Sequence, residues 1–570
     1  MSSFYSSGRF ALGCLILAQG VRSDDVPTVE NFLRRSIGSA TLLGNYVYID
    51  GGEILHKGAG QQALPVNSTL SIDMSESWTT SDVVIRSIPK PGPHKGGTTV
   101  WTNEKDGEFY SWGGKWPYGI NMSSTTDLWK FKADGKGGGE WSVQPPKSPN
   151  VFNELHPTEN AAFTNNEDTG FHIGGWVTQW TDKRHKTDDQ PVPGMITFNM
   201  RTKEWQNGTV QFSPFGRDVA VGGSAHYISR HTFNAPDGLV MVLGGSKTTA
   251  TSFKRDWDAM SFFDLDNPTF FDPGSMKSFT QKTVGKAFPP GPRAGFCLTG
   301  FRTADFSGYD LFLYGGFRAS DGNKYNDAWV LTLPAFVWHR VDDAPGGGRE
   351  WLNCIKVGNG QVLSIGGTNG TFTNKDPAPN GLQLFDMSTL RWTDSYNAND
   401  NTYERADAIK QIYTNWTWDD VDWSPDGVQE MFSNAAPSKT PEPSSDSQGS
   451  TPVGAIVGGV VGGVAAIAII GFLVWFLLRR RRRNRHDSIP LQEPDSPARG
   501  GGYSDAPQNN MKLMFPQEMG GNQVVDGYQE APGVGKGSYA QQELDGQAVT
   551  GSYELQSGQT QQRGPAAELA

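Results

Sequence analysis

Short apolar stretches with alternating polar positions recur along residues 30–395, and six of them end in a Gly-Gly pair. The six stretches read YVYIDGG, FYSWGG, FHIGG, VMVLGG, LFLYGG and VLSIGG. Their glycines are Gly51, Gly52, Gly113, Gly114, Gly174, Gly175, Gly244, Gly245, Gly315, Gly316, Gly366 and Gly367. Period-two alternation bounded by Gly, Asn and Asp predicts short antiparallel strands.

Each Gly-Gly pair is followed by a polar loop, a further alternating stretch and then a large aromatic residue. The alternating stretches are residues 70–74, 127–131, 196–200, 261–265, 328–333 and 382–387. The aromatic residues are Trp78, Trp141, Trp205, Phe270, Trp338 and Trp392, and each is expected to open a fourth strand. The interval between pairs varies from 51 residues (Gly315 to Gly366) to 71 residues (Gly244 to Gly315), which predicts loops of uneven length. A repeat of this size indicates one supersecondary unit per copy.

These repeats resemble the kelch repeat, whose hallmark is a strand ending in Gly-Gly followed by a downstream Trp. The resemblance covers roughly residues 30–395 and implies an all-β, kelch-type β-propeller with one four-stranded blade per repeat. Glycine would allow close backbone approach at the inner strands, and the aromatic side chain would fill the wedge between blades. Six blades are recognisable. A seventh blade, or a closing strand drawn from residues 395–432, stays open.

Two apolar segments predict the topology of the chain. Residues 1–20 have the pattern of a signal peptide, with an apolar core at 10–18 and a small-x-small site at 18–20. Residues 453–478 carry no charge and are long enough to cross a bilayer, and an arginine run at 479–483 follows at once. The positive-inside rule places that run in the cytoplasm. The alternatives are a buried N-terminal strand and a buried soluble helix. We expect a single-pass type I protein of the plasma membrane or cell surface, with its N-terminus outside.

The remaining segments complete this domain organisation. Residues 21–432 form the predicted ectodomain, residues 433–452 a Ser/Thr/Pro-rich stalk, and residues 479–570 a disordered cytoplasmic tail. Sequons at Asn67, Asn121, Asn207, Asn369 and Asn415 all precede the span and predict a glycoprotein. Glycines spaced by four in the span suit a homodimer, and the tail offers sites for a cytoplasmic protein. This order of segments also resembles a group of fungal single-pass kelch membrane proteins, with RRSIGSATLLGNYVYIDGGE as the matching stretch.

Charge and cysteine content narrow the function. The net charge is −11, which gives no electrostatic case for nucleic-acid binding. Only three cysteines occur, and Cys14 lies in the predicted signal peptide. Cys297 and Cys354 fall on the first strands of two neighbouring blades. A disulfide between them needs Cα atoms about 5.5 Å apart, which neighbouring inner strands rarely provide. Two buried free thiols are therefore the favoured interpretation, and a disulfide between these cysteines is the alternative.

An enzymatic function has one specific candidate. Some secreted kelch propellers are copper-radical oxidases related to galactose oxidase, and that chemistry needs two His, two Tyr and a Cys crosslinked to one Tyr. The histidines are scattered along this sequence without metal-ligand spacing, so no metal site and no cofactor are predicted. A membrane-tethered oxidase remains the alternative to a binding function.

Tryptophans beside two Gly-Gly pairs are the candidate ligand contacts. Trp116 and Trp180 lie just past the predicted strand ends in SWGGKWPYG and HIGGWVTQW. If exposed, their rings would stack on sugars; packing between blades is the favoured alternative for this group of tryptophans. The sequence thus predicts a cell-surface binding module, a glycosylated propeller that presents loops to a wall glycan or a protein partner.

Overall fold

The computed structural model describes residues 25–433 except 118–121, 123–125, 187–188, 209–217, 231, 250–260, 319–321, 359, 400–402 and 425–426. The chain divides into two units, 1–446 and 447–570, and every described residue belongs to the first. In this described part no helix is long and apolar enough to cross a membrane. The predicted signal peptide, the span at 453–478, the cytoplasmic tail, the stalk beyond Ser433 and Asn121 lie outside the described residues.

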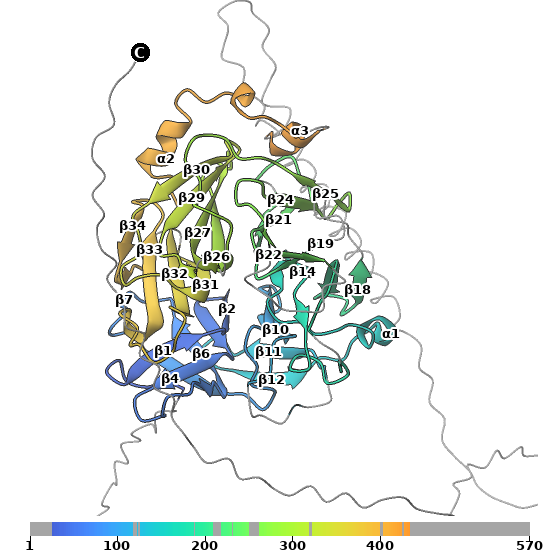
Figure 1. Ribbon diagram of the computed structural model, residues 1–570, viewed down its shortest axis with the longest axis vertical. Coiled ribbons are helices and arrows are strands. Elements are labelled where there is room, and N and C mark those ends of the chain that lie inside the picture. Colours follow the sequence, from blue (N-terminus) through green and yellow to red (C-terminus); the bar gives the residue numbers. More distant parts are fainter. Residues whose placement is uncertain are drawn as a thin grey trace, which may run out of the picture. The chain divides into compact units, whose positions relative to one another are not determined.

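Six antiparallel sheets follow one another along the described chain, one for each repeat (Figure 1). Five of them have four strands, and the sheet of blade 5 has a short fifth strand as well. Blades 1 and 2 are β2 (Ser39–Leu43), β3 (Tyr46–Asp50), β6 (Ser68–Asp73), β8 (Ile85–Pro89), and β9 (Thr99–Asn103), β10 (Glu108–Trp112), β11 (Trp129–Ala133), β12 (Gly139–Val143). Blades 3 and 4 are β13 (Ala162–Asn165), β14 (Thr169–Ile173), β17 (Met195–Asn199), β18 (Trp205–Gly208), and β20 (Ser224–Ile228), β21 (Leu239–Leu243), β24 (Thr269–Asp272), β25 (Lys277–Thr280). Blades 5 and 6 are β26 (Ala294–Arg302), β27 (Tyr309–Arg318), β29 (Ala328–Leu333), β30 (Val337–Val341), and β31 (Glu350–Val357), β32 (Gln361–Thr368), β33 (Leu382–Asp386), β34 (Arg391–Thr393).

The two ends of each blade differ. At one end, here called the turn face, mostly short connections join strand one to strand two and strand three to strand four. At the other end, here called the loop face, mostly longer connections join strand two to strand three, as between β14 and β17. Short extra strands lie in or beside these connections: β1 (Phe32–Ser36), β4 (Glu53–His56), β5 (Leu64–Pro65), β15 (Trp176–Val177), β16 (Gln190–Pro191), β19 (Asp218–Val221), β22 (Ser246–Thr249), β23 (Ser261–Phe262) and β28 (Asn323–Lys324). The helix α1 (Pro149–Phe152) lies in the connection between blades 2 and 3.

The Gly-Gly pairs hold neighbouring blades together. A Cβ on Gly315 would lie 2.6 Å from the carbonyl oxygen of Arg349 in the next blade, and φ at Gly315 is +75°. The amide of the second glycine, Gly316, donates to the same carbonyl oxygen at 2.9 Å. The boundary between two neighbouring blades is here called a seam. The same kind of hydrogen bond crosses other seams from the amides of Gly52, Gly114 and Gly245. Only glycine combines this backbone conformation with such a close approach.

The large aromatic residues fill the wedges between blades, as the repeat predicts. Trp205 of blade 3 packs against Trp101 and Trp112 of blade 2, with ring centroids 5.7 and 5.2 Å away. Trp392 of blade 6 lies 4.8 Å from Tyr314 of blade 5. These rings are largely removed from water, which makes each seam a small hydrophobic core.

Two of the six expected fourth strands were placed wrongly. Trp78 lies on β7 (Trp78–Thr79), which stands apart from blade 1, and the fourth strand of that blade begins at Ile85. Phe270 lies on the third strand of blade 4, opposite Phe279 of the fourth strand. The stretch 261–265 is not that third strand, because Ser261 and Phe262 pair with β22. An insertion in each of these repeats moved an apolar or aromatic residue to the expected spacing.

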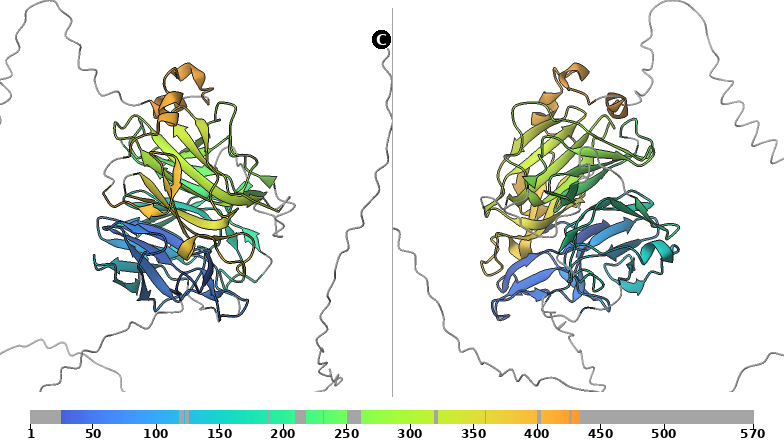
Figure 2. Two further views of the ribbon diagram at one scale, coloured as in Figure 1. Left: turned by 90° about the vertical axis from the view of Figure 1, so that its left-hand side faces the viewer. Right: turned by 45° about the vertical axis from the view of Figure 1, so that its right-hand side comes forward.

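A closing strand is present after blade 6, and the described residues of 395–433 form no seventh blade. β35 (Ser395–Tyr396) pairs with β7, so that the end of the repeat region is joined to blade 1. The chain then forms α2 (Asp407–Ile412), a 3-10 turn η3 (Trp418–Asp420) and α3 (Val428–Phe432). Figure 2 shows these helices together at one end of the blades.

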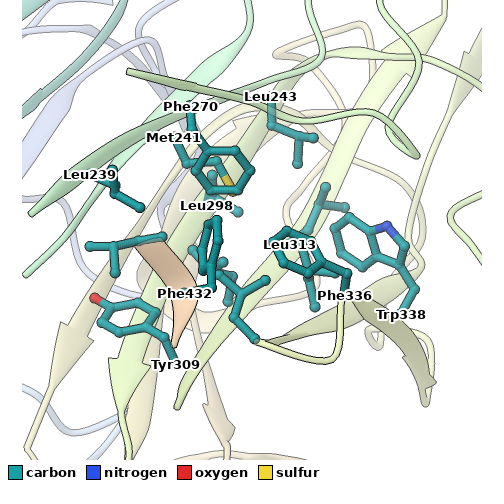
Figure 3. Close-up of a cluster of buried hydrophobic side chains, with 14 of the residues drawn as sticks. Leu239, Met241, Leu243, Phe270, Leu298, Tyr309, Leu313, Phe336, Trp338 and Phe432 are labelled. Carbon is teal, nitrogen blue, oxygen red and sulfur yellow. The ribbon is translucent and has the colours of Figure 1, made fainter. Parts of the chain in front are cut away.

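Residues 403–433, here called the C-terminal segment, are fastened to the turn face of blades 4 and 5. Phe432 of α3 lies among apolar side chains of both blades, with its ring centroid 5.3 Å from Phe270 and 4.9 Å from Phe336 (Figure 3). The buried carboxylate of Asp310 accepts hydrogen bonds from the hydroxyl of Tyr403 at 2.6 Å and from Nε of Arg405 at 2.9 Å. Apolar and ionic contacts therefore both hold this segment in place.

Candidate functional site

The first strands of all six blades surround one central cavity of about 930 Å³. Its lining comes from β2, β9, β13, β20, β26 and β31 and from the residues next to them. This volume lies in the range of small-molecule sites. Because the cavity is the place where the six repeats meet, it is the first candidate for a functional site.

Most polar side chains in the cavity wall are used to join one inner strand to the next. Ser39 donates to the carbonyl of Thr98 at 2.5 Å, and the amide of Asn165 donates to the carbonyl of Thr102 at 3.0 Å. Ser224 donates to the carbonyl of Phe296 at 2.9 Å, and the amide of Asn353 to that of Gly38 at 2.6 Å. Between blades 3 and 4, the amide of Tyr227 donates to the hydroxyl of Thr164 at 3.0 Å. These groups hold the ring together and are poorly placed to act on a ligand.

A ring of left-handed residues lies at the loop-face end of the cavity. Each blade contributes one residue with positive φ just before or at its inner strand: Ile37, Gly97, Asn160, Gly222, Gly295 and Trp351. Backbone hydrogen bonds connect several neighbours, including Gly97 to Ile37 at 2.6 Å and Gly295 to Gly222 at 2.8 Å. Positive φ is unfavourable for a β-branched residue such as Ile37, so the closed ring must hold it there.

The seam between blades 5 and 6 is joined covalently. Cys297 on β26 and Cys354 on β31 form a disulfide across neighbouring inner strands, with Cα atoms 5.3 Å apart. The favoured interpretation of two free thiols is therefore wrong. The two inner strands run side by side in equivalent positions, and at this depth of the seam they are as close as a disulfide requires.

The turn-face end of the cavity carries the titratable groups. Nε2 of His226 is hydrogen-bonded to the hydroxyl of Tyr309 at 2.7 Å, and burial lowers the pKa of His226 to about 3. Glu167 pairs with Arg230 at 3.2 Å. Lys356 also lines this end, on the blade 6 side. The imidazole is thus neutral at physiological pH, and Lys356 carries the positive charge on its side of the cavity.

The two tryptophans singled out as ligand contacts are not part of this cavity. Trp116 is only 7% exposed, and the ammonium of Lys95 lies 5.4 Å from the centroid of its ring. The amide of Trp116 donates to the carbonyl of Trp180 at 3.0 Å. Trp180 is half-buried. Trp116 therefore lacks the exposed ring that stacking on a sugar needs, because the chain after Gly114 folds back onto the loop of blade 3 and the ring is covered.

The side chains that an oxidase of the galactose-oxidase type would need are engaged elsewhere. Cys297 and Cys354 are both in the disulfide and are unavailable for a bond to tyrosine. His172 is buried between blades 2 and 3, where its ring nitrogens are hydrogen-bonded to Thr99 at 2.7 Å and Thr158 at 2.8 Å. Among the described residues, no three His, Cys, Asp or Glu side chains gather in a group that could hold a metal ion.

The sequon asparagines that the structure describes are accessible. Asn67, Asn207, Asn369 and Asn415 are all exposed. Asn67 and Asn369 lie on the loop face, and Asn415 lies in the C-terminal segment. Exposure is a condition for glycosylation, and these four positions meet it.

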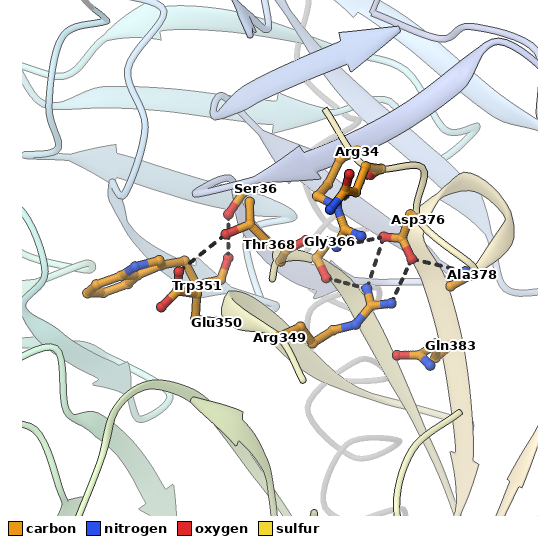
Figure 4. Close-up of polar contacts among 12 residues, drawn as sticks. Arg34, Ser36, Arg349, Glu350, Trp351, Gly366, Thr368, Asp376, Ala378 and Gln383 are labelled. Atoms are coloured by element: carbon orange, nitrogen blue, oxygen red, sulfur yellow. Dashed lines mark hydrogen bonds and ion pairs between the residues drawn. The ribbon is translucent and has the colours of Figure 1, made fainter. Parts of the chain in front are cut away.

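The sequence did not predict the buried ion pairs of the structure. Arg349 pairs with Asp376 at 2.7 Å, and Arg34 of the N-terminal strand β1 lies 3.8 Å from the same carboxylate (Figure 4). Arg293 pairs with Asp327 in the equivalent place of blade 5. The available signal was an arginine two residues before the left-handed position, as in Arg293 and Arg349.

No protein-family model matches the chain. The chain is similar to a kelch repeat-containing protein of Arthroderma benhamiae, with 23% identity over 417 residues. The match covers 66% of this chain and 59% of that relative's length. The all-β fold of six antiparallel sheets fits a kelch propeller, and the kelch relative matches two thirds of the chain. The resemblance of this chain to kelch-repeat β-propeller proteins is therefore confirmed.

Proposed function

We propose that the chain is a membrane-anchored cell-surface module whose propeller binds a protein partner through its loop face. A kelch-repeat propeller suggests protein binding, and loops carried by a rigid scaffold are the usual place for it. The observation that carries the proposal is the difference between the two faces. The C-terminal segment is packed on the turn face of blades 4 and 5, whereas the loop face bears the long connections.

The proposed location outside the membrane rests on the sequence and agrees with two features of the described residues. A signal peptide (1–20), a span (453–478) and the arginine run after it give the orientation. The Cys297–Cys354 disulfide is typical of an oxidising compartment. The four described sequon asparagines are exposed. A homodimer through the Gly-rich span and a cytoplasmic partner for the tail are further parts of this proposal.

The partner class and the binding face are tested together on living cells. A photo-crosslinking amino acid replaces Lys375, which is exposed on the loop face of blade 6, or Thr389, which is exposed on the turn face of the same blade. We expect a discrete protein adduct of the full-length chain from position 375 and none from position 389. Equal adducts from both positions would contradict the loop-face assignment.

A wall glycan is the alternative ligand. The purified full-length chain is applied to a glycan array and to isolated cell wall. Specific glycan binding without any protein adduct would replace the protein partner by a glycan. Copper bound in stoichiometric amount, with peroxide formed from an alcohol, would instead support the oxidase.

A further inference from the structure

Lys356, in the wall of the central cavity, has no ion-pair partner in the described part of the chain and lies near a second cation, Arg302. Lys356 lies near the end of β31, at the turn-face end of the cavity. Its ammonium lies 5.1 Å from the centroid of the Phe301 ring in blade 5. Among the described residues it forms no hydrogen bond and no ion pair. Lys356 is exposed to solvent, so water and the π face of this one phenylalanine together stabilise its ammonium.

The groups nearest to Lys356 add positive charge instead of neutralising it. Burial lowers the pKa of Lys356, and the charge of Arg302 at the end of β26 lowers it further. The guanidinium of Arg302 packs over the Phe306 ring, 4.0 Å from its centroid. His226 faces the same region, and its neutral imidazole is held by Tyr309. Lys356 and a neutral imidazole therefore line this part of the cavity, and the charge of Arg302 adds to that of the lysine.

The acidic residues of the cavity are on the other wall, in blades 2 and 3, and each has a partner of its own. Glu167 pairs with Arg230 at 3.2 Å, and Asp168 lies 3.9 Å from Arg201. Glu104 accepts a hydrogen bond from the amide of Gly44 at 3.2 Å. These carboxylates do not compensate Lys356. The cavity thus has one wall with balanced charge and one wall with an unbalanced positive charge.

We propose that the turn-face end of the central cavity binds a small organic anion whose carboxylate pairs with Lys356. A carboxylate there would give the ammonium the counter-ion that it lacks, and the field of Arg302 would add to the attraction. The cavity volume of about 930 Å³ accommodates a ligand of metabolite size. The site is distinct from the loop face, and it does not depend on the identity of the macromolecular partner.

The proposal is tested by isothermal titration calorimetry of the purified full-length chain at low salt, with citrate, glucuronate and inorganic phosphate as separate probes. We expect citrate or glucuronate to bind, and Lys356→Met to weaken this binding at least tenfold. Lys356→Arg, which keeps the charge, should bind within a few-fold of wild type. The matched control is Lys105→Met, because Lys105 lines the same cavity on the blade 2 side and follows Glu104 in the sequence. This variant should bind citrate or glucuronate with the affinity of the wild type.

Four results would overturn the proposal. They are no heat with citrate or glucuronate, equal affinity of Lys356→Met and wild type, equal loss in Lys356→Met and Lys105→Met, and binding of phosphate alone. The third would mean that net charge drives the binding, and the fourth that the site takes a different anion. If Lys356→Met does not fold, Lys356→Gln takes its place, since its amide still hydrogen-bonds to water in the open cavity.

Discussion

Blade 6 is joined to blade 5 on one side and to blade 1 on the other, and the interactions that hold these two seams are partly different. The seam to blade 5 carries the Cys297–Cys354 disulfide, between residues 57 positions apart, and a cluster of buried rings. The seam to blade 1 joins the two ends of the repeat region, and its contacts connect residues more than 300 positions apart. There a buried, mainly aliphatic cluster of blades 1 and 6 is accompanied by hydrogen bonds, the strand pair β7–β35 and the ion pairs around Asp376.

This difference shows how the ring is closed. The disulfide strengthens a seam between neighbours in sequence, which are close as soon as blades 5 and 6 form. The closure seam can form only when all the blades are in place, so the entropy of a long loop opposes it. Apolar packing and many separate polar contacts hold it, and one buried carboxylate lies beside two arginines. We therefore expect the closure seam to be the more sensitive to a single polar substitution.

The largest effect is expected for Asp376→Ala. The carboxylate accepts from Arg349 at 2.7 and 3.1 Å, lies 3.8 Å from Arg34, and its side chain is fully buried. Its removal leaves two buried guanidiniums without a counter-charge, which should cost about 3–5 kcal/mol of unfolding free energy. Denaturant unfolding of the purified chain measures this loss. The control Asp343→Ala breaks the exposed pair with Arg340 and should cost less than about 1 kcal/mol. Equal losses would refute the special role of Asp376.

Removal of the disulfide should have the next largest effect. The double variant Cys297→Ser, Cys354→Ser should lose about 2–4 kcal/mol, because the bond closes a loop of 57 residues in the unfolded chain. The same loss should appear in the wild type under reducing conditions and not in the variant. Alkylation of the unreduced, denatured protein should find neither of these two thiols. Labelling of both would restore the free-thiol interpretation.

Alanine at the first glycine of a pair probes how closely the blades approach. Gly315 has φ +75° and a potential Cβ 2.6 Å from the next blade's carbonyl, whereas the potential Cβ of Gly366 lies 2.9 Å from the carbonyl of Arg35. Gly322 has φ +64° and nothing within 4 Å. Gly322→Ala should cost only the strain of positive φ, about 1–2 kcal/mol. We expect thermal unfolding to rank the losses as Gly315→Ala, then Gly366→Ala, then Gly322→Ala. A different order would mean that backbone strain outweighs the contact.

The smallest effect is expected for Ser36→Ala in the closure seam. The hydroxyl of Ser36 donates to the carbonyl of Trp351 at 3.1 Å, and its loss should cost about 0.5–1.5 kcal/mol. Ser81→Ala, at an exposed turn, should change the unfolding midpoint very little. Combined with the cysteine double variant, the loss from Ser36→Ala should add without coupling, because the two changes lie in different seams. Strong coupling would show that the seams open as one unit.

Much of the architecture follows from local signals. Alternation and the Gly-Gly pairs placed the second strands of all six blades, and the aromatic residue of blades 2, 3, 5 and 6 lies on the fourth strand as expected. Blades 1 and 4 differ because insertions changed the spacing, and spacing was the sole guide to Trp78 and Phe270. The candidate site was predictable in less detail. A propeller implies a central cavity. The sequence around Lys356, however, does not show that the charged group near its ammonium in the folded chain is an arginine and not a carboxylate.

The sequence by itself determined the repeat, the all-β class and the positions of the glycines that the seams require. These properties depend on the period of side chains along a strand and on the freedom of glycine, and both are local. Only the tertiary structure decided that Cys297 bonds to Cys354, that Trp116 is covered, that Asp376 lies beside two arginines and that Lys356 lines the cavity without an ion-pair partner among the described residues. Each of these depends on the distance between neighbouring blades. That distance results from the packing of all six repeats around one axis, so no single segment of the chain determines it.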